Sequence, residues 1–497
     1  MKRVLCSRRM KACDRKEILS RTPSSVLMDR AAEAVFEVLK SDFNCERVLF
    51  VCGGGNNGGD GILAAVKAFS AGFNAEILFC GDEALCTAET SDCLKKARVC
   101  GVPFITDIEK KYTVIVDAIF GIGLSREIDG SLAEIIEKVN GSGAKVLSVD
   151  IPSGICADNG EIMGTAVKAD VTVAVAAYKM GHFTGEAADY VGRIVCVDIG
   201  IPTEDADNYD GFGDIVPYAL DFEDIALLPE RPRNANKGTC GRALIIGGAK
   251  GMCGAVYLSA LAAYRSGAGL VEVFCDEANR IPLQTLLPEA VVTCSDFSEP
   301  DMNKLSMALC RADAVCIGPG MSRSIGALRI LSYVYKNIRC PLVADADALN
   351  LTAQYSLELP RSNKTVITPH PLELSRLTAI PVDDLKASFW INASEYAREK
   401  GVVCVAKDHA TCITDGETVY INTSGTPALA KGGSGDVLSG VITAFLCRGL
   451  DGITAASLGA YVHGAAGEYA ERYYGVSAPL ASEVADMVGE VLREAGR

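Results

Sequence analysis

The first half of the chain alternates between short apolar runs and longer segments whose apolar positions recur at helical spacing. The runs RVLFVCG (47–53), AEILFCG (75–81) and TVIVDAIFG (113–121) have the length and β-branched content of strands. Residues 17–40 and 60–71 carry the helical pattern. Continuously apolar strands that alternate with helices are buried on both faces. This half is therefore predicted to form a doubly wound, Rossmann-like α/β domain around a parallel sheet.

The pattern changes over residues 205–238, which are first acidic and then rich in proline and arginine. Such a stretch is typical of a domain boundary, and we expect one domain over 1–218 and another over 219–497. A hairpin with a polar turn is predicted over 406–416. The second domain has its own strand-like runs at 242–248, 270–275, 314–320, 341–350, 365–370 and 402–407. It is predicted to be a second α/β domain with many strands.

The charge and the cysteine content of the chain indicate which functional classes of protein fit it poorly. The chain has 63 acidic and 48 basic residues, a net charge of −15 and no block of lysine or arginine. This balance argues against a nucleic-acid or membrane binder, although local backbone amides could still bind a small anion. The 20 cysteines form no CxxC pair, and no apolar run approaches membrane-spanning length. We therefore expect a cytoplasmic protein with reduced, mostly buried thiols.

The stretch VCGGGNNGGDGI (51–62) follows a predicted strand and precedes a predicted helix. Glycines let backbone amides face a ligand, and a helix N-terminus favours phosphate. The spacing is not the GxGxxG of dinucleotide cofactors. Its two asparagines and Asp60 add side chains that could bond a ribose or a phosphate-linked group. The alternative is a tight turn that binds nothing.

Two further strand ends, VDAIFGIGLSRE (116–127) and VDIPSG (149–154), place Asp117, Asp150 and Ser153 where ligands bind in open α/β sheets. Oxygens that converge from separate strands can coordinate a hard cation or act as acid and base. Taken singly, each of these residues could equally cap a turn or a helix.

Two further motifs are AAYKMGHFTG (176–185) and VDIGIP (197–202). Together with the glycine-rich stretch and the two strand ends above, they make residues 8–215 resemble the NAD(P)H-hydrate epimerase family. The resemblance implies a potassium ion near Asn57, Asp117 and Ser153, and an acid/base role for Asp150 beside the nicotinamide ring. The implied contacts to the hydrated nucleotide are Asn56, Asn57, Gly58, Gly59, Asp60, Gly121, Ile122, Gly123, Leu124, Ser125, Arg126, Glu127 and Asp150. The chain departs from the family pattern at two places, where LMDRAAEAV replaces LMExAGxAV and KMG replaces KPG. Neither departure removes one of the implied ligands.

In the second domain, the stretch GTPALAKGGSGDVLSG (425–440) precedes an apolar helical run. Gly432, Gly433 and Gly435 let consecutive N–H groups point outward, which forms an anion hole strengthened by the helix dipole. The stretch lacks the lysine of a P-loop. Asp436 would repel a phosphate, so its predicted task is to accept a proton from a hydroxyl that attacks a phosphoryl group. The alternative is an aspartate that only caps the helix.

The motifs ALIIGGA, GAGLVEV, GPG, DADALN, TPHPLEL and GGSGDVLSG occur in this order and make residues 222–497 resemble the ribokinase-like fold. More narrowly, they resemble the ADP/ATP-dependent NAD(P)H-hydrate dehydratase family. The resemblance implies a ribokinase-like α/β sandwich with contacts to the hydrated dinucleotide from Ala255, Gly320, His370 and Asp436. The implied contacts to the adenine nucleotide are Lys407, Asp408, His409, Ala410, Thr411 and Gly435.

Three positions depart from the pattern of that family. Asn236 replaces the histidine of HKG, KDHAT (407–411) replaces a KGA- or KAG-like sequence, and Leu372 replaces the glycine of PHPGE. Because the catalytic loop is unchanged, these departures bear on nucleotide preference rather than on the chemistry. His370 could also be a structural hydrogen bonder between its prolines. The remaining histidines lack the spacing of a zinc site.

The two resemblances together imply a bifunctional repair enzyme. The first domain would interconvert the R and S hydrates of NADH and NADPH with K⁺. The second would dehydrate the S epimer with Mg²⁺ and ADP, or less readily ATP; the ADP reaction would give AMP and phosphate. We also expect a homo-oligomer. The alternative is a ribokinase-like small-alcohol kinase with a non-catalytic Rossmann-like binding domain, which would release a stable phosphorylated product.

Overall fold

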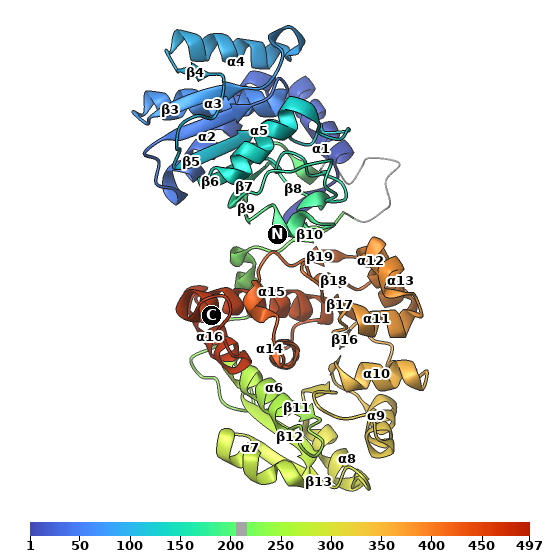
Figure 1. Cartoon of the computed structure of the whole chain (residues 1–497). Coiled ribbons are helices and arrows are strands. Elements are labelled where there is room, and N and C mark those ends of the chain that lie inside the picture. The colour runs from blue at the N-terminus through green and yellow to red at the C-terminus, as the bar shows by residue number, and fades with distance from the viewer. Residues whose placement is uncertain (205–215) are drawn as a thin grey trace. The chain divides into compact units, whose positions relative to one another are not determined.

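The computed structural model describes residues 1–204 and 216–497, so the acidic stretch 205–215 of the expected boundary lies outside the described residues. The chain divides into two compact units, Lys2–Val216 and Pro217–Arg497 (Figure 1). Each unit is built around its own mainly parallel sheet, which confirms the α/β class predicted from the apolar runs.

The N-terminal sheet is parallel throughout, with strand order β4, β3, β2, β5, β6, β7, β9. In β2, Val48 and Phe50 face a core formed with α2, α3 and α4, whereas Leu49 and Val51 face a second core formed with α5. Both faces are thus covered, which is why the strand sequences are continuously apolar. The strands are β2 (Val48–Cys52), β3 (Ala75–Phe79), β4 (Phe104–Ile105), β5 (Val114–Ala118), β6 (Lys145–Val149), β7 (Val171–Val175) and β9 (Arg193–Val197).

One segment of this unit with a helical pattern is divided between two helices. The helical pattern over 17–40 falls on two helices, since α1 ends at Ser20 and α2 begins at Ser24, directly after Pro23. Proline has no N–H and disfavours a helical conformation in the residue before it, which explains the interruption. The helices are α1 (Ser7–Ser20), α2 (Ser24–Asp42), α3 (Asn56–Ser70), α4 (Ala88–Val99) and α5 (Gly130–Gly141), and β1 (Lys2–Leu5) pairs with β8 (Tyr178–Lys179).

The C-terminal sheet runs in the order β13, β12, β11, β14, β15, β16, β17, β18, β19, β10. Strands β13 to β17 are parallel, and β17 and β18 form the hairpin predicted over 406–416. The strands are β10 (Tyr218–Ala219), β11 (Arg242–Ile246), β12 (Leu270–Asp276), β13 (Val291–Ser295), β14 (Ala314–Ile317), β15 (Leu342–Ala344), β16 (Thr365–Ile367), β17 (Val403–Ala406), β18 (Cys412–Thr414) and β19 (Val419–Ile421).

The helices of this unit position its polar loops. Ala243 and Ile245 of β11 share a core with α6, α14, α15 and α16. The loops after β14, β15, β16 and β17 lie at the carboxyl edge of the sheet, where α14 begins. The helices are α6 (Cys253–Arg265), α7 (Arg280–Leu286), α8 (Met302–Arg311), α9 (Ile325–Asn337), α10 (Asp347–Gln354), α11 (Pro371–Thr378), α12 (Val382–Ala387), α13 (Phe389–Lys400), α14 (Ser434–Cys447), α15 (Gly452–Tyr474) and α16 (Ala481–Glu494). Across residues 1–204 and 216–497, no helix has the length and apolar character to span a bilayer.

Candidate active sites

A cavity of about 470 Å³ opens in the N-terminal unit at the carboxyl ends of β2, β5, β6 and β7. Because these strands are parallel, the segments that follow them meet at one edge of the sheet, where ligands of open α/β sheets bind. The residues of the predicted substrate site that line this cavity are Asn56, Asn57, Asp60, Gly121, Ile122, Gly123, Leu124 and Asp150.

The glycine-rich loop brings the start of α3 to the cavity. Gly55 precedes Asn56, the first helical residue, and both line the cavity. Amides in the first turn of a helix have no partner within the helix and favour an anion. Gly58 instead packs inward, since a Cβ atom there would lie 1.8 Å from the Gly53 carbonyl oxygen. The predicted contacts that lie outside the cavity lining are Gly58, Gly59, Ser125, Arg126 and Glu127.

Asp150 is paired with a buried lysine that we did not predict as a site residue. The Lys179 ammonium contacts Asp150 Oδ1 and donates to the carbonyl oxygens of Val175 at 2.7 Å and Ala177 at 2.9 Å. Only 1% of Lys179 is exposed, and these three acceptors match the three protons of an ammonium group. Asp150 itself has φ of 68°, a strained value for a residue other than glycine. The sequence signal was a lysine directly after the apolar run VTVAVAAY.

His182 fixes the backbone of this ion pair from behind. Its Nδ1 accepts the N–H of Lys179 at 3.1 Å, and its Nε2 lies 2.9 Å from the Asp150 carbonyl oxygen. Nε2 must therefore carry the proton. Burial, followed by the charge of Lys179, lowers the pKa of His182 to about 4. The imidazole is thus neutral, and its two hydrogen bonds hold the backbone of Lys179 and Asp150 in place.

Asp60 provides a second carboxyl group to the same cavity. Burial raises the pKa of Asp60 well above its ordinary value, and the charges of Asp150 and Asp14 add to this rise. The charge of Lys179 opposes it with a smaller effect. Asp14 of α1 also lines the cavity, and its own pKa is raised, first by burial. The cavity therefore pairs a lysine-bound carboxylate with a carboxyl group that tends to hold its proton.

Asp117 lies beneath the cavity and is fully buried. It accepts hydrogen bonds from Ser148 Oγ at 2.8 Å, Ser153 Oγ at 2.6 Å, Ser153 N at 2.8 Å and Ile119 N at 3.3 Å. Burial raises its pKa, while these neutral donors oppose the shift. The Nδ2 of Asn57 is also buried without a hydrogen-bond partner in the described structure. The Asp117 carboxylate and the Ser153 hydroxyl are oxygen ligands that a hard cation prefers, whereas the unpaired Asn57 Nδ2 is a donor.

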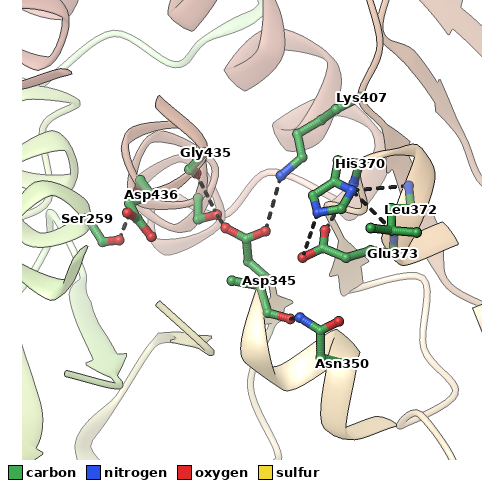
Figure 2. A network of polar contacts seen from close by, with 11 residues as sticks. Ser259, Asp345, Asn350, His370, Leu372, Glu373, Lys407, Gly435 and Asp436 are labelled. Atoms are coloured by element: carbon green, nitrogen blue, oxygen red, sulfur yellow. Dashed lines mark hydrogen bonds and ion pairs between the residues drawn. The ribbon is translucent and has the colours of Figure 1, made fainter. Parts of the chain in front are cut away.

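The second site surrounds the first turn of α14. Gly433 precedes the helix with φ of 99°, and Asp436 is the third helical residue (Figure 2). The backbone carbonyl of Asp436 accepts from Ser259 Oγ of α6 at 2.9 Å. Burial, followed by the charge of Asp345, raises the pKa of the Asp436 carboxyl to about 7, while Lys407 opposes this shift. A carboxyl group with this pKa is suited to act as a base near neutral pH.

Lys407 extends toward the same turn from the end of β17 (Figure 2). Its Nζ lies 3.2 Å from Asp345 Oδ1, and a Cβ atom on Gly435 would lie 3.3 Å from that Nζ. The helix amides and the ammonium group thus face one place, which suits a phosphate. Of the predicted adenine-nucleotide contacts, Lys407 and Gly435 are brought together here. The others, Asp408, His409, Ala410 and Thr411, form the turn between β17 and β18.

His370 caps α11 at this edge of the sheet. Its Nδ1 accepts from the N–H groups of Leu372 at 3.1 Å and Glu373 at 3.2 Å, so Nε2 carries the proton. Burial, and then the charges of Lys407 and Arg376, lower the pKa of His370. A neutral ring with a fixed donor can bind a substrate oxygen. His370 can therefore cap α11 through Nδ1 and still contact a ligand through Nε2, so the two interpretations do not exclude each other.

Ala255 and Gly320 are adjacent in the structure. Gly320 follows β14 with φ of 54°, and a Cβ atom there would lie 3.1 Å from Ala255 Cβ and 2.8 Å from Met252 Cβ. Gly320 also accepts the N–H of Ala249 at 2.7 Å, which ties the loops after β11 and β14 together. This close approach explains the glycine at position 320.

Comparisons with known proteins cover both units. A family model described as NAD(P)H-hydrate dehydratase matches residues 243–488, and one described as YjeF-related protein N-terminus matches residues 24–181. A relative from Coxiella burnetii, named bifunctional NAD(P)H-hydrate repair enzyme Nnr, is 33% identical over 485 residues, which cover 96% of this chain and 97% of the relative. The chain belongs to the family of bifunctional NAD(P)H-hydrate repair enzymes.

Solved structures resemble the C-terminal unit of this repair-enzyme family member. A ribokinase-like superfamily protein from Enterococcus faecalis is 29% identical with a TM-score of 0.52, and the match covers 58% of this chain and 98% of that one. An ADP/ATP-dependent NAD(P)H-hydrate dehydratase from Bacillus subtilis, co-crystallised with ATP and Mg²⁺, is 31% identical with a TM-score of 0.50, covering 56% and 98%. The ribokinase-like architecture expected from the sequence is confirmed.

Two departures from the repair-family pattern have structural explanations. Asn236 Oδ1 accepts the N–H groups of Gly238 at 2.9 Å and Thr239 at 3.2 Å, so asparagine closes this turn by itself. The side chain of Leu372 is exposed, and its N–H binds His370 Nδ1. Neither residue disturbs the groups around Asp436.

Proposed function

We propose that this chain repairs hydrated NADH and NADPH in two steps. The N-terminal unit, assigned to residues 1–218 from the sequence, interconverts the R and S hydrates. The C-terminal unit, assigned to 219–497, dehydrates the S hydrate with ADP. The observation that carries the proposal is the second site, where the half-buried Asp436, with a pKa near 7, faces the phosphate-binding start of α14. Family membership supports both assignments.

The first cavity supports acid/base chemistry at the hydrated carbon. That carbon bears a hydroxyl group and is bonded to the ring nitrogen. Removal of the hydroxyl proton opens the bond to nitrogen, and reclosure on the opposite face gives the other epimer. Asp150, which the Lys179 ammonium contacts, is the proposed base, and Asp60, which tends to hold its proton, can protonate the ring nitrogen. The amides at the start of α3 and the Asn57 amide would bind polar groups of the substrate.

Potassium fits beneath this cavity. Asp117 is a buried carboxylate whose hydrogen-bond donors are all neutral, and Ser153 adds a hydroxyl oxygen beside it. We propose that Asp117, Ser153 and Asn57 hold K⁺. When bound, the cation would offset the charge of Asp117 and fix the loop that lines the cavity.

The second site supports activation of a poor leaving group. The hydroxyl oxygen of the S hydrate attacks the terminal phosphorus of ADP, Asp436 takes the hydroxyl proton, and AMP departs. The carbon–oxygen bond of the phosphate ester then breaks, inorganic phosphate leaves, and loss of a proton from the adjacent ring carbon restores the dihydronicotinamide. The amides near Gly435 and the Lys407 ammonium bind the transferring group. Ala255, Gly320 and His370 would contact the hydrate, and residues 408–411 the adenine nucleotide.

Magnesium would arrive with the nucleotide. Within residues 1–204 and 216–497, no three His, Cys, Asp or Glu side chains converge as a metal cage. Mg²⁺ is commonly held through substrate phosphates and few protein groups, which fits this arrangement. When bound, it would neutralise charge on the phosphates. Preference for ADP over ATP, a cytoplasmic location and assembly into a homo-oligomer stay predictions.

An assay of the full chain tests the function. Purified protein is mixed with both hydrate epimers, Mg²⁺, K⁺ and either ADP or ATP, and the return of the reduced-nicotinamide absorbance is followed. We expect complete return with the wild type. Asp436→Asn should abolish the return while R/S exchange continues, and Asp150→Asn should strand the R epimer. A phosphorylated product that accumulates would instead indicate the small-alcohol kinase.

A further inference from the structure

Asp345 is a buried carboxylate at the centre of the second site that the mechanism above does not use. It follows β15 in the DADALN segment and is 2% exposed. Both oxygens are engaged: Oδ1 lies 3.2 Å from Lys407 Nζ, and Oδ2 accepts from Ser439 Oγ of α14 at 2.6 Å. Figure 2 shows it between Lys407 and the helix that carries Asp436. A carboxylate so enclosed cannot reach a substrate hydroxyl, so it cannot be the base.

The ion pair places a cation where the phosphate chain must lie. Lys407 Nζ would be 3.3 Å from a Cβ atom on Gly435, and Asp345 Oδ2 would be 3.9 Å from it. Any side chain at position 435 would therefore push against the ammonium group. About a fifth of the Lys407 side chain is exposed, so it is not fully enclosed by the protein. Without Asp345, the long Lys407 side chain would lose this ion pair and could adopt other rotamers.

We propose that Asp345 is a positioning residue for the dehydration step: it holds the Lys407 ammonium beside Gly435, where that ammonium binds the phosphoryl group during transfer. The proposal rests on the proposed function and assigns Lys407 to the phosphate end of the nucleotide rather than to its adenine. Ser439 supports the arrangement from α14, since its hydroxyl bridges Asp345 and the Gly435 carbonyl oxygen, 3.0 Å away.

A second consequence concerns the base. The charged groups that face Asp436 are Asp345 and Asp347 from the segment after β15 and Lys407 from the end of β17, and the neutral thiol of Cys316 lies close by on β14. After burial, Asp345 is the largest cause of the raised pKa of Asp436. Removing the charge at position 345 should therefore lower the pH at which Asp436 becomes ionised.

The test compares Asp345→Asn with the wild type in the full chain, with the S hydrate and ADP as substrates. Asparagine keeps the shape and can still pair with Ser439, so the variant removes the charge. We expect kcat to fall by about 10²-fold, as for loss of a group that stabilises transferring charge. The acid limb of the pH profile, where kcat rises with pH as Asp436 loses its proton, should move to lower pH. R/S exchange by the N-terminal unit should be unchanged, and a wild-type urea unfolding transition of the C-terminal unit would show that the variant is folded.

Asp347→Asn is the matched control. Asp347 also raises the pKa of Asp436, but its carboxylate accepts the Ser322 N–H at 2.8 Å. We expect a smaller shift of the acid limb and an unchanged affinity for ADP, measured by calorimetry. An equal loss of kcat in both variants would contradict a specific role of Asp345.

A double-mutant cycle with Lys407→Met decides whether Asp345 acts through Lys407. If it does, Asp345→Asn should cost less than about threefold further in kcat once Lys407→Met is present. Fully additive losses would overturn the proposal.

If Asp345→Asn does not fold, Ser439→Ala removes one of the groups that hold Asp345 and should give a smaller loss of kcat. An unchanged kcat in that folded variant would also overturn the proposal. A wild type that fails to dehydrate the S hydrate contradicts the proposed function, whereas an active wild type with unaltered variants contradicts only this inference.

Discussion

Identical side chains have different tasks in this molecule because their surroundings differ. Asp150 is bound by the ammonium of Lys179, whereas Asp60 in the same cavity has a raised pKa. In the second site, Asp345 has both oxygens engaged and Asp436 has a carboxyl with a pKa near 7. Each site thus contains one carboxylate held by a lysine and one carboxyl group whose pKa is raised, first by burial.

The pH dependence of dehydration follows from Asp436. A base must be deprotonated, and burial with the charge of Asp345 raises the pKa of Asp436 to about 7. The value of kcat/KM for the S hydrate should therefore rise about tenfold per pH unit below pH 7 and level off above it. A stopped-flow profile measures this directly. An acid limb centred near pH 4, the range of an unperturbed aspartate, would contradict the role of Asp436.

Lys179→Met should impair the first activity alone. The substitution leaves the Asp150 carboxylate without its buried partner, which costs about 3–5 kcal/mol in the free energy of unfolding. R/S exchange should fall by at least about 10²-fold, because the proposed base loses the contact that holds it in position. Exchange measured by NMR and unfolding by urea check both effects.

The control for Lys179→Met is Lys145→Met. Lys145 pairs with Asp170 at 2.6 Å, but Lys145 is exposed and Asp170 is only half-buried. Surface pairs contribute about 0–1 kcal/mol, so exchange and stability should hardly change. If the two variants lost the same activity, the special role of Lys179 would be disproved.

At the scale of elements, both sites use the start of a helix that follows a glycine-rich loop. Helix α3 begins at Asn56 after Gly55, and α14 begins at Ser434 after Gly433. In each case, the first turn of the helix offers free backbone amides and the positive end of the helix dipole, which favour an anion. The strands supply the polar side chains, since their carboxyl ends meet at the same edge.

The turn before α14 can be tested with a pair of glycines. Gly433 has φ of 99°, and a Cβ atom there would lie 2.5 Å from Leu258 Cδ1, whereas a Cβ atom on Gly432 would meet no atom within 4 Å. Gly433→Ala should cost roughly 1–2 kcal/mol of backbone strain. We expect the dehydration rate to fall at least about tenfold, on the usual scale for a lost phosphate contact. Gly432→Ala should be close to wild type in the same absorbance assay; equal effects would exclude a role for the Gly433 conformation.

Much of the fold could be predicted from hydrophobic patterns, because strands such as β2 are buried on both faces and read as continuous apolar runs. The break at Pro23 could have been recognised from the proline itself. Lys179 and Asp345 were not predicted as site residues. Their importance depends on contacts across 29 and 62 residues of sequence, which a local pattern does not contain.

At the scale of the whole molecule, two activities share one chain. The dehydration site is proposed to accept the S hydrate, so the R hydrate would be stranded without the first unit. The family model matches at 24–181 and 243–488 fall on separate compact units. Each unit contains its own polar site, which suggests that each activity can be removed separately.

Mixing two inactive variants tests this separation. Asp150→Asn should leave R hydrate unconverted where spontaneous exchange is slow, and Asp436→Asn should restore no reduced nicotinamide. An equimolar mixture should convert both epimers completely, since the S hydrate can diffuse from one molecule to another. Chromatography of the epimers follows the outcome. A mixture that still strands R hydrate would mean that the substrate must pass between sites within one molecule.

The ratio of inorganic phosphate released to reduced nicotinamide restored tests the central claim most directly. The glycine-rich start of α14 is proposed to be a phosphoryl-transfer site, and the phosphate ester that forms there is proposed to eliminate phosphate. With ADP and the S hydrate, we predict one phosphate and one AMP for each reduced nicotinamide, with no phosphorylated dinucleotide detected by mass spectrometry. A stable phosphorylated product, or nucleotide consumption without recovery of the reduced nicotinamide, would contradict the account.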